Sequence, residues 1–234
     1  MGADVQATAV STAMATTRAS VAVSLAGTNL FALVYVGYRD GDTSVSASYD
    51  GTAMTKEASA ISGVVRGALF SLTNGSAGIV PIVIEWPVTA INVAIGIISF
   101  TSVNQTTPLG PIHTVVSAGP ANASANASAA PGDLPLGFIS CADAAISAFQ
   151  SDVLFNQVAA NGAPDHSTIG VLDTGDNTLR VFRWGDIGTS TYIALGVQVR
   201  MFQATAGAAG PFGITGGTGT TSGELGVTDP MGSV

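Results

Sequence analysis

The chain has 234 residues, of which 47% are hydrophobic and 9% are charged, and its formal net charge is −8. This length accommodates one large β domain or two small ones, and the apolar fraction is sufficient for a sizeable core. The single lysine and six arginines are too few to form a basic patch, which argues against duplex nucleic acid or an anionic membrane surface as a partner.

An average soluble protein has about 25% charged residues, so Ser, Thr, Asn, Gln and Gly must cover much of this surface. Such a composition is typical of extracellular or particle-bound β proteins, and weakly charged surfaces tend to associate. The chain begins with no basic or apolar leader, and no apolar run reaches the roughly 18 residues of a membrane helix. We therefore expect no signal peptide and no transmembrane segment, which favours a virion protein assembled in the host cytoplasm or a protein exported without a leader.

Helical periodicity is nearly absent, and short β-rich runs alternate with turn residues at spacings of about 8 to 12 residues. This pattern predicts a β-sandwich or a barrel. The predicted strands span residues 19–25, 30–38, 44–49, 52–58, 65–72, 79–86, 91–100, 113–118, 134–140, 153–159, 167–173, 178–184 and 190–201.

Both faces of the strand at 30–38 are apolar, which predicts a central strand covered on both sides. In SVSASY (44–49) one face is small and polar, which is typical of an outer face in contact with water. Asp50-Gly51 lies between two strand-like runs and is the strongest short hairpin signal. Further turns are expected at 39–42, 173–177 and 184–186, where Gly, Asp and Asn suit the turn backbone.

Three segments break the strand pattern. Residues 119–132 predict a surface loop or a poorly patterned edge strand, and residues 142–150 are compatible with a short helix. Residues 203–234 are rich in Gly and Thr and cannot bury enough surface to fold alone. We expect a β domain over 1–202 and an extended C-terminal arm over 203–234, with a disordered tail as the alternative for the arm. The arm would bind a partner through its isolated apolar residues, Phe212, Ile214, Leu225 and Val227.

The segment Ser99–Pro111 follows an apolar run and contains no obvious acid, base or nucleophile. Phe100 is expected to end a core strand, and Gln105 with the adjacent threonines to satisfy backbone groups of the turn. Pro108 is expected to stop the strand before the chain crosses between sheets.

These motifs carry a resemblance to a known family over about residues 20–201. The matching positions are Tyr49-Asp50-Gly51-Thr52-Ala53-Met54-Thr55, then Ser99, Phe100, Val103, Gln105, Pro108, Leu109 and Gly110, then Pro131–Leu134, and finally the strand YIALGVQVR. They resemble a concanavalin-A-like jelly-roll domain that recurs in tailed-phage virion proteins and bacterial surface proteins. The resemblance implies an all-β, antiparallel, two-sheet jelly-roll sandwich. Such domains serve as adhesive, carbohydrate-binding or capsid-associated modules and share no catalytic residues.

Metal and nucleophile chemistry finds little support in the sequence. The two histidines, His113 and His166, lack metal-ligand spacing, and Cys141 lies in an apolar run that predicts a buried, inert thiol. Oxygen ligands for calcium occur in two turns, at 40–42 and 173–177, but neither follows the twelve-residue loop pattern, so solvated turns are favoured.

Two carboxylate hypotheses are also weak. Val171-Leu172-Asp173-Thr174-Gly175 resembles the loop of an aspartic protease, yet those enzymes need two such aspartates and this chain has one. Glu57 and Glu85 could form a glycosidase pair only if the fold brought them together across a cleft. We therefore expect no enzyme activity, no catalytic residue, no cofactor and no metal.

Two functions remain. The first is a virion structural protein, a phage capsid decoration (cement) protein that binds the major capsid protein or other virion proteins and forms homo-oligomers. The second is a receptor- or glycan-binding module of a tail fibre or surface adhesin. Its candidate stacking residues are Trp86, Trp184, Tyr38 and Tyr192, although a chain with 6% aromatic residues needs most of them for its core.

Overall fold

The computed structural model describes residues 5–12, 16–40, 44–118, 123–128, 130–141, 147–148, 153–160, 166–172, 179–185 and 191–201. Across these ranges the regular elements are all β-strands with antiparallel pairing, which confirms the all-β, antiparallel prediction. The chain divides into the units Met1–Phe202 and Gln203–Val234, and every described residue belongs to the first. The predicted arm and its residues Phe212, Ile214, Leu225 and Val227 lie outside the described residues.

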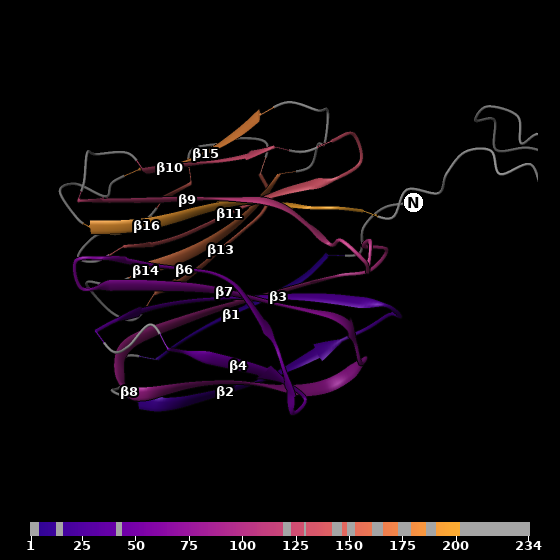
Figure 1. Cartoon of the computed structure of the whole chain (residues 1–234), viewed down its shortest axis with the longest axis horizontal. Helices are drawn as coiled ribbons and strands as arrows, with labels where there is room; N and C mark the ends of the chain where they lie inside the picture. Colours follow the sequence, from indigo (N-terminus) through magenta and orange to yellow (C-terminus); the bar gives the residue numbers. More distant parts are fainter. Residues whose placement is uncertain are drawn as a thin grey trace, which may run out of the picture. The chain divides into compact units, whose positions relative to one another are not determined.

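The strands form three hydrogen-bonded sheets (Figure 1). Their bounds are β1 (Val5–Thr12), β2 (Thr16–Leu25), β3 (Leu30–Arg39), β4 (Ser46–Tyr49), β5 (Thr52–Ala53), β6 (Thr55–Ser62), β7 (Val65–Gly75), β8 (Gly78–Phe100), β9 (Leu109–Ala118), β10 (Ala123–Ser128), β11 (Leu134–Cys141), β12 (Ser147–Ala148), β13 (Val153–Ala160), β14 (His166–Leu172), β15 (Leu179–Gly185) and β16 (Thr191–Val199). The main sheet has the order β5-β4-β8-β3-β7-β6, with β1 and β2 also paired to β8. The five-stranded sheet has the order β13-β14-β11-β16-β9, and the three-stranded sheet has the order β10-β15-β12.

The long strand β8 organises the main sheet. It joins two segments that the sequence predicts as separate strands, 79–86 and 91–100. Its first half pairs with β2 and β4, and its second half pairs with β1 and β3. Between the halves Asn92 has a φ of +50°, and the pairing with β3 slips between Gly37 and Arg39. Such a bulge bends a strand, so the main sheet folds over and nearly closes into a six-stranded antiparallel barrel.

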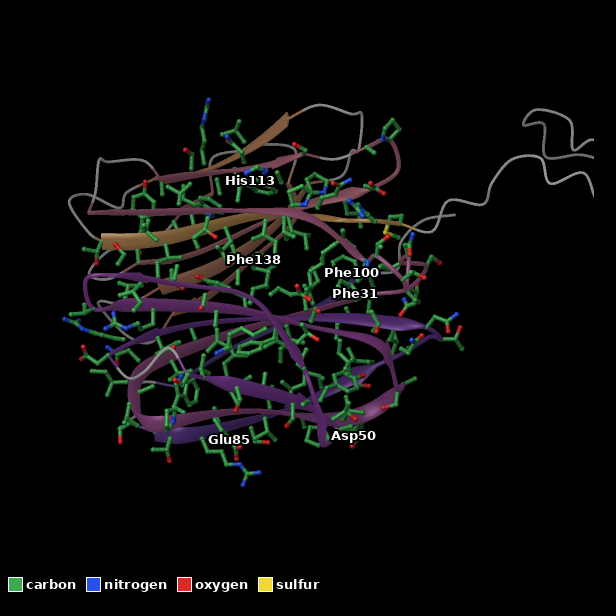
Figure 2. All side chains as sticks on the ribbon, viewed as in Figure 1. Phe31, Asp50, Glu85, Phe100, His113 and Phe138 are labelled. Carbon is green, nitrogen blue, oxygen red and sulfur yellow. The ribbon has the colours of Figure 1, made fainter. Side chains whose placement is uncertain are left out.

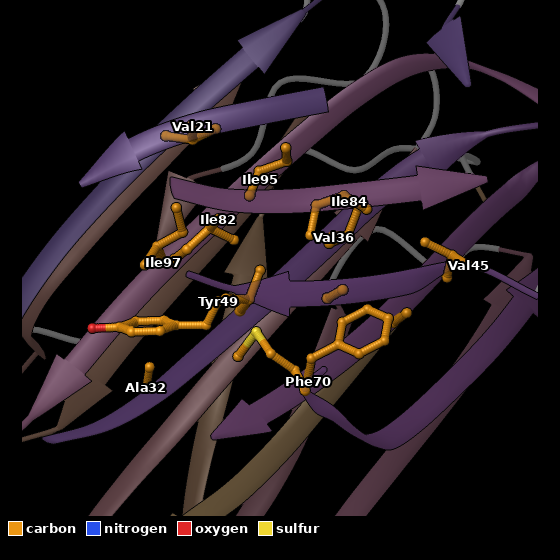
Figure 3. Close-up of a cluster of buried hydrophobic side chains, with 14 of the residues drawn as sticks. Val21, Ala32, Val36, Val45, Tyr49, Phe70, Ile82, Ile84, Ile95 and Ile97 are labelled. Atoms are coloured by element: carbon orange, nitrogen blue, oxygen red, sulfur yellow. The ribbon is translucent and has the colours of Figure 1, made fainter. Parts of the chain in front are cut away.

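The predicted two-sheet jelly-roll sandwich is therefore wrong. The physical reason is visible in β3, whose two faces are both apolar. Ala32, Val34 and Val36 face a first core inside the folded main sheet (Figure 3). Phe31, Leu33 and Tyr35 lie in a second core, which the main sheet shares with β11 and β16 of the five-stranded sheet. A strand with two apolar faces needs cover on both sides, as the sequence predicts for 30–38. Here the folded main sheet covers one face of β3, and the five-stranded sheet covers the other as a third layer.

The second core holds the main and five-stranded sheets together. Figure 2 places Phe31 and Phe100 of the main sheet and Phe138 of β11 between the two sheets. Tyr35 of β3 stacks against Phe138, with ring centroids 5.2 Å apart. Full burial of a large aromatic side chain removes about 150–250 Å² of its surface from water. These aromatic contacts therefore stabilise the packing of the main sheet against the five-stranded sheet.

A third core lies between the five-stranded and three-stranded sheets. In β10 the residues alternate between buried alanines and exposed serine or asparagine, and β10 forms one end of its sheet. Of the two interpretations of 119–132, the edge strand is thus confirmed over Ala123–Ser128. The short helix that is possible over 142–150 does not form at Ser147–Ala148, which pair with β15 as strand β12. The other residues of that segment lie outside the described ranges.

A pair of glycines allows the third core to be thin. Gly137 of β11 lies opposite Gly196 of β16. A Cβ atom on Gly196 would lie 2.0 Å from the backbone oxygen of Asn126, and one on Gly137 would lie 2.4 Å from the Phe182 ring. The three-stranded sheet therefore rests directly on the backbone of the five-stranded sheet, and no larger residue fits at these two positions without movement.

The hairpin predicted at Asp50-Gly51 is confirmed. Tyr49 pairs with Thr52 across a two-residue loop, and both loop residues have positive φ, +48° and +78°. These values match a type I′ turn, whose twist suits the flanking strands. Asp40 also has a positive φ, +51°, where β3 ends. The rest of that turn, and the predicted turn at 173–177, lie outside the described residues.

Candidate functional site

Among the residues that the structure describes, those with catalytic or metal-binding potential are not gathered into a site. Within the described ranges there is no group of three or more His, Cys, Asp and Glu residues that could hold a metal ion. Cys141 is buried, as predicted, and forms part of the third core. His113 is exposed on β9, while His166 belongs to β14 and Asp173 lies outside the described residues.

The two glutamates considered for glycoside hydrolysis have separate partners. Glu57 accepts a hydrogen bond of 2.5 Å from the Ser71 hydroxyl, and Glu85 forms a solvent-exposed ion pair of 3.4 Å with Arg18. Glu57 lies on β6 and Glu85 on the first half of β8, and these strands are not neighbours in the main sheet. Each carboxylate is therefore tied to its own neighbour instead of facing the other across a cleft.

The aromatic residues considered for glycan stacking belong to the cores. Trp86 is 4% exposed and meets Tyr38 edge-on, with ring centroids 5.6 Å apart. Trp184 is 1% exposed and stacks with Phe182, and Tyr192 is buried in the same third core. These side chains have no free ring face for a sugar, so the glycan hypothesis loses the residues that would carry it.

One buried polar pair links the second core across its two sheets. The hydroxyl groups of Tyr35 on β3 and Ser140 on β11 lie 2.9 Å apart. Burial raises the pKa of Tyr35 well above its usual value, and the hydrogen bond with Ser140 opposes that shift only in part. The phenol therefore stays neutral, and its hydrogen bond satisfies a group that would otherwise be buried without a partner.

Through Gln105, the loop between β8 and β9 is tied to the loop between β2 and β3 and to the end of β7. The side-chain oxygen of Gln105 accepts a hydrogen bond of 2.8 Å from the backbone N–H of Asn74. Its amide nitrogen donates to the backbone oxygens of Asn29 (3.0 Å) and Val103 (3.2 Å). Asn29 and Asn74 both have positive φ, so Gln105 fixes turns that are strained for residues other than glycine. The predicted role of Gln105 is confirmed.

The same loop also joins the main sheet to the end of β16. The backbone N–H of Asn104 donates to the oxygen of Arg200, and the N–H of Arg200 donates to the oxygen of Pro108. Strand β8 ends at Phe100, as predicted, but Pro108 is not the residue that stops it. Pro108 instead lies just before β9, where the chain enters the five-stranded sheet. The adjacent threonines differ from expectation, because it is the side chain of Asn104 that accepts hydrogen bonds from the N–H groups of Thr106 and Thr107.

A buried carboxylate closes this end of the five-stranded sheet. Asp133 is 5% exposed and accepts hydrogen bonds from the Gln198 side chain and from the backbone N–H of Met201. Gln198 lies so close to Gly110 that a Cβ on this glycine would overlap the amide oxygen. The arrangement leaves Asp133 with structural partners and no access to a substrate.

The remaining candidate is a surface. We define the outer face as the side chains of β2, β4 and the first half of β8 that point away from the first core. They are exposed or half-buried and small or apolar: Ser20, Ala22, Ser24, Ser46, Ser48, Ile79, Pro81 and Val83. Val83 lies between Ser20 and Ser48 in register, and Ile79, with 79% of its surface exposed, lies opposite Ser24.

Charge is nearly absent from the outer face. The ion pair of Arg18 and Glu85 lies at one end, and Asp50 lies at the β4–β5 turn (Figure 2 labels Glu85 and Asp50). The Ser and Ala alternation in SVSASY gave the sequence signal for part of this face. The β2 side carries the same signal in ASVAVS, but only the pairing with β8 shows that the two segments form one surface.

Comparison with known protein families, with curated proteins and with solved structures finds no match for this chain. In the part of the chain that the structure describes, no helix is long and apolar enough to cross a membrane.

Proposed function

We propose that this chain is a non-enzymatic structural protein of a virion, a phage capsid decoration protein that binds and stabilises the shell. The observation that carries the proposal is the outer face, an exposed β surface of small and apolar side chains with its one ion pair at the edge. Surfaces with so little charge tend to associate.

The physical advantage of such a face lies in its low desolvation cost. A surface without lysine, arginine, aspartate or glutamate at its centre can be covered by a partner without stripping water from a charge. The formal net charge of −8 is carried by other positions of the chain. A β-sheet packs face to face against another sheet at about 10 Å, and the shell protein is the proposed partner.

The C-terminal segment 203–234 enters the proposal as a second contact. Its residues Phe212, Ile214, Leu225 and Val227 would bind the major capsid protein or neighbouring virion proteins. A contact made by a tethered segment is intramolecular once the domain is bound, so it raises avidity without a new domain. Homo-oligomers on the particle and assembly in the host cytoplasm belong to the same proposal.

Particle binding tests the proposal. Purified chain is added to particles that lack it, and occupancy after density-gradient banding and the temperature of genome release are measured. The proposal predicts saturable occupancy and a higher release temperature. Ile79→Glu, which places a charge in the outer face, and deletion of 203–234 should each lower occupancy. Ser124→Glu, on the exposed side of β10, is the matched control and should bind like the wild type.

The absence of saturable binding by the wild-type chain would overturn the proposal. Binding to a defined oligosaccharide on a glycan array would instead favour the receptor-binding alternative. No described residue favours that alternative, because the four aromatic side chains that could stack on a sugar are buried.

A further inference from the structure

Strand β2 forms an edge of the main sheet. It pairs with β8 along one side, and no other described strand pairs with its second side. Its ten residues include no proline and only one charged residue, Arg18. An unpaired strand edge presents backbone N–H and C=O groups to any other strand that approaches.

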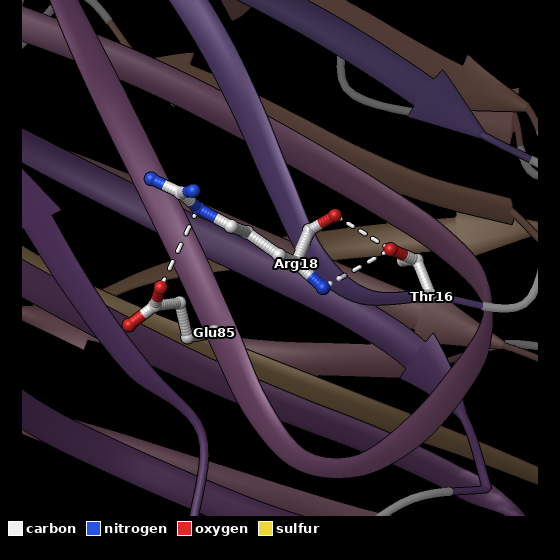
Figure 4. Close-up of polar contacts among 3 residues, drawn as sticks. All are labelled: Thr16, Arg18 and Glu85. Carbon is white, nitrogen blue, oxygen red and sulfur yellow. Dashed lines mark hydrogen bonds and ion pairs between the residues drawn. The ribbon is translucent and has the colours of Figure 1, made fainter.

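The hydrogen bonds of Thr16 show which backbone groups of β2 face this open side. The Thr16 hydroxyl accepts a hydrogen bond of 3.0 Å from the N–H of Arg18 and donates one of 2.5 Å to its C=O (Figure 4). Both groups of Arg18 therefore point away from β8 and are closed off by a side chain. Because the hydrogen-bonding side alternates along a strand, the backbone groups of Ser20, Ala22 and Ser24 point to the same open side.

Pro81 gives an independent check of this alternation. It lies directly opposite Ala22 in the pairing of β2 with β8. Proline has no N–H to offer, and the C=O of Pro81 accepts a hydrogen bond of 2.9 Å from the N–H of Asp50, beyond β4 on the other side of β8. Ala22 therefore exchanges no backbone hydrogen bond with Pro81, and its own N–H and C=O face outward.

Two of the other long edges, β6 and β9, carry features that discourage pairing. The edge strand β6 has Lys56 and Glu57 next to a register slip between Lys56 and Ala58. The edge strand β9 contains Pro111 and pairs with β16 through a second slip. Charges, prolines and bulges are common protections of natural edge strands. The segment Ser20–Ser24 has none of them, which marks it as an edge available for pairing.

We propose that two copies of this chain associate through β2, antiparallel and about a two-fold axis at Ala22. In this register Ala22 faces Ala22 of the second copy, and Ser20 faces Ser24 of the second copy. Each of these residues has its outward N–H and C=O in position to exchange hydrogen bonds with the residue that it faces. Directly opposite residues share a face, so the outer faces of the two copies join into one continuous surface.

No acidic side chain of β2 opposes a second copy at this edge. Two chains that each carry −8 repel one another, and the approach is least opposed where acidic side chains are absent. The residues that would meet are small and uncharged, and the Arg18 side chains lie at opposite ends of the paired segment, each facing Ala26 of the second copy. Because the Thr16 hydroxyl occupies the backbone groups of Arg18, the hydrogen bonds between the two copies would end before Arg18. The paired segment is therefore limited to the residues around Ala22.

The axis at Ala22 gives a specific test, since residue 22 would meet itself. Ala22→Lys and Ala22→Glu each place like charges face to face, and should weaken dimerisation of the full chain at least about tenfold. An equimolar mixture of the two variants places opposite charges face to face and should restore a dimer. Ser46→Lys, on the same outer face but on β4, is the matched control and should leave the dimer unchanged. Sedimentation velocity from about 1 to 200 µM covers the affinity expected of a small interface.

Ala22→Pro provides a second variant that keeps the fold. Because the N–H of Ala22 is not used within the chain, proline should leave the melting temperature close to that of the wild type while it removes the hydrogen bonds at the axis. A wild-type chain that stays monomeric over this range would overturn the proposal. A dimer that resists all three Ala22 variants, or a charge-swap mixture that fails to restore association, would also overturn it. The readout uses the isolated chain, so it does not depend on the proposed virion function.

Discussion

The first and third cores bury strand faces in opposite ways. The first core is filled by branched aliphatic side chains, including Ile82, Ile84 and Ile95, inside one folded sheet. The third core contains the alanines of β10 and the aromatics of β15, and the glycine pair of β11 and β16 brings the two sheets close together. The first core is stabilised by the volume of its packed side chains, and the third core by the close approach of its two sheets. The first should therefore be sensitive to the loss of atoms and the third to their addition.

The largest effect is expected from the removal of atoms from the first core. Ile82 is fully buried there, and Ile82→Ala should lower the free energy of unfolding by about 3 to 4 kcal/mol, measured by urea denaturation. Ile82→Val removes a single methylene group and should cost about 1 kcal/mol. Equal effects of the two variants would show that this core is not packed by volume.

The third core should fail when a single carbon is added. Gly196→Ala places a Cβ 2.0 Å from the backbone oxygen of Asn126 and should cost about 2 to 3 kcal/mol as β10 is displaced. The control is Gly51→Ala, which meets no atom within 4 Å and has only its positive φ to lose. Its cost should be about 1 kcal/mol. If Gly196→Ala proved milder than Gly51→Ala in thermal melts, the close approach of the two sheets would be refuted.

The loop that joins the sheets should show an intermediate effect. Gln105→Ala removes the hydrogen bonds to Asn29 and Asn74 and should lower stability by about 1 to 2 kcal/mol. Hydrogen exchange should rise first at Asn74, whose N–H loses its acceptor. Thr106→Ala is the control, because the Asn104 side chain accepts from the Thr106 backbone, which remains. A uniform rise in exchange across the sheets would contradict this local role.

The Tyr35 pair should affect the pH dependence more than stability at neutral pH. Burial raises the pKa of Tyr35 in the folded state, so folding favours the protonated phenol. This contribution is present below the ordinary tyrosine pKa of about 10 and is lost as the pH rises above it. Tyr35→Phe should cost about 1 kcal/mol at pH 7 and should show a smaller loss of stability between pH 9 and about 11 than the wild type. Parallel pH profiles for the two proteins would contradict this account.

The smallest effect is expected at the surface. Arg18 and Glu85 form an ion pair that is more than half exposed on both side chains. Such pairs contribute roughly 0 to 1 kcal/mol, so Glu85→Gln should leave the melting temperature nearly unchanged. Any difference in melting temperature between the variant and the wild type should become smaller in about 0.5 M NaCl, which screens exposed charges. A large loss of stability would assign the outer face a structural role beyond that of a contact surface.

The same contrast between cores explains what could be predicted from the sequence. The alternation of aliphatic residues predicts the strands of the first core, and the residue types of Asp50-Gly51 predict the hairpin. The sequence does not distinguish a loop from an edge strand at β10, because the buried face of this strand consists only of alanine. The close approach of β10 to Gly196 also cannot be predicted from the sequence, because a glycine does not indicate which backbone segment packs against it.

The union of 79–86 and 91–100 into β8 was missed for a different reason. Pro87 usually ends a strand, and here the chain continues through it into the bend at Asn92. With β8 divided, the sequence predicts a two-sheet sandwich in place of one folded sheet with further layers. Part of the outer face is indicated by the polar alternation of 44–49, whereas the phase of the β2 edge depends on the contacts of Thr16 and Pro81.

Electron cryo-microscopy of native particles tests the proposed virion function most directly. Difference density between particles that carry the chain and particles that lack it locates each copy on the particle. The proposal predicts density at symmetry-related positions on the shell, with the outer face of β2, β4 and β8 turned toward the capsid protein. Density confined to the tail fibres, or no difference density on particles made with the chain, would contradict it.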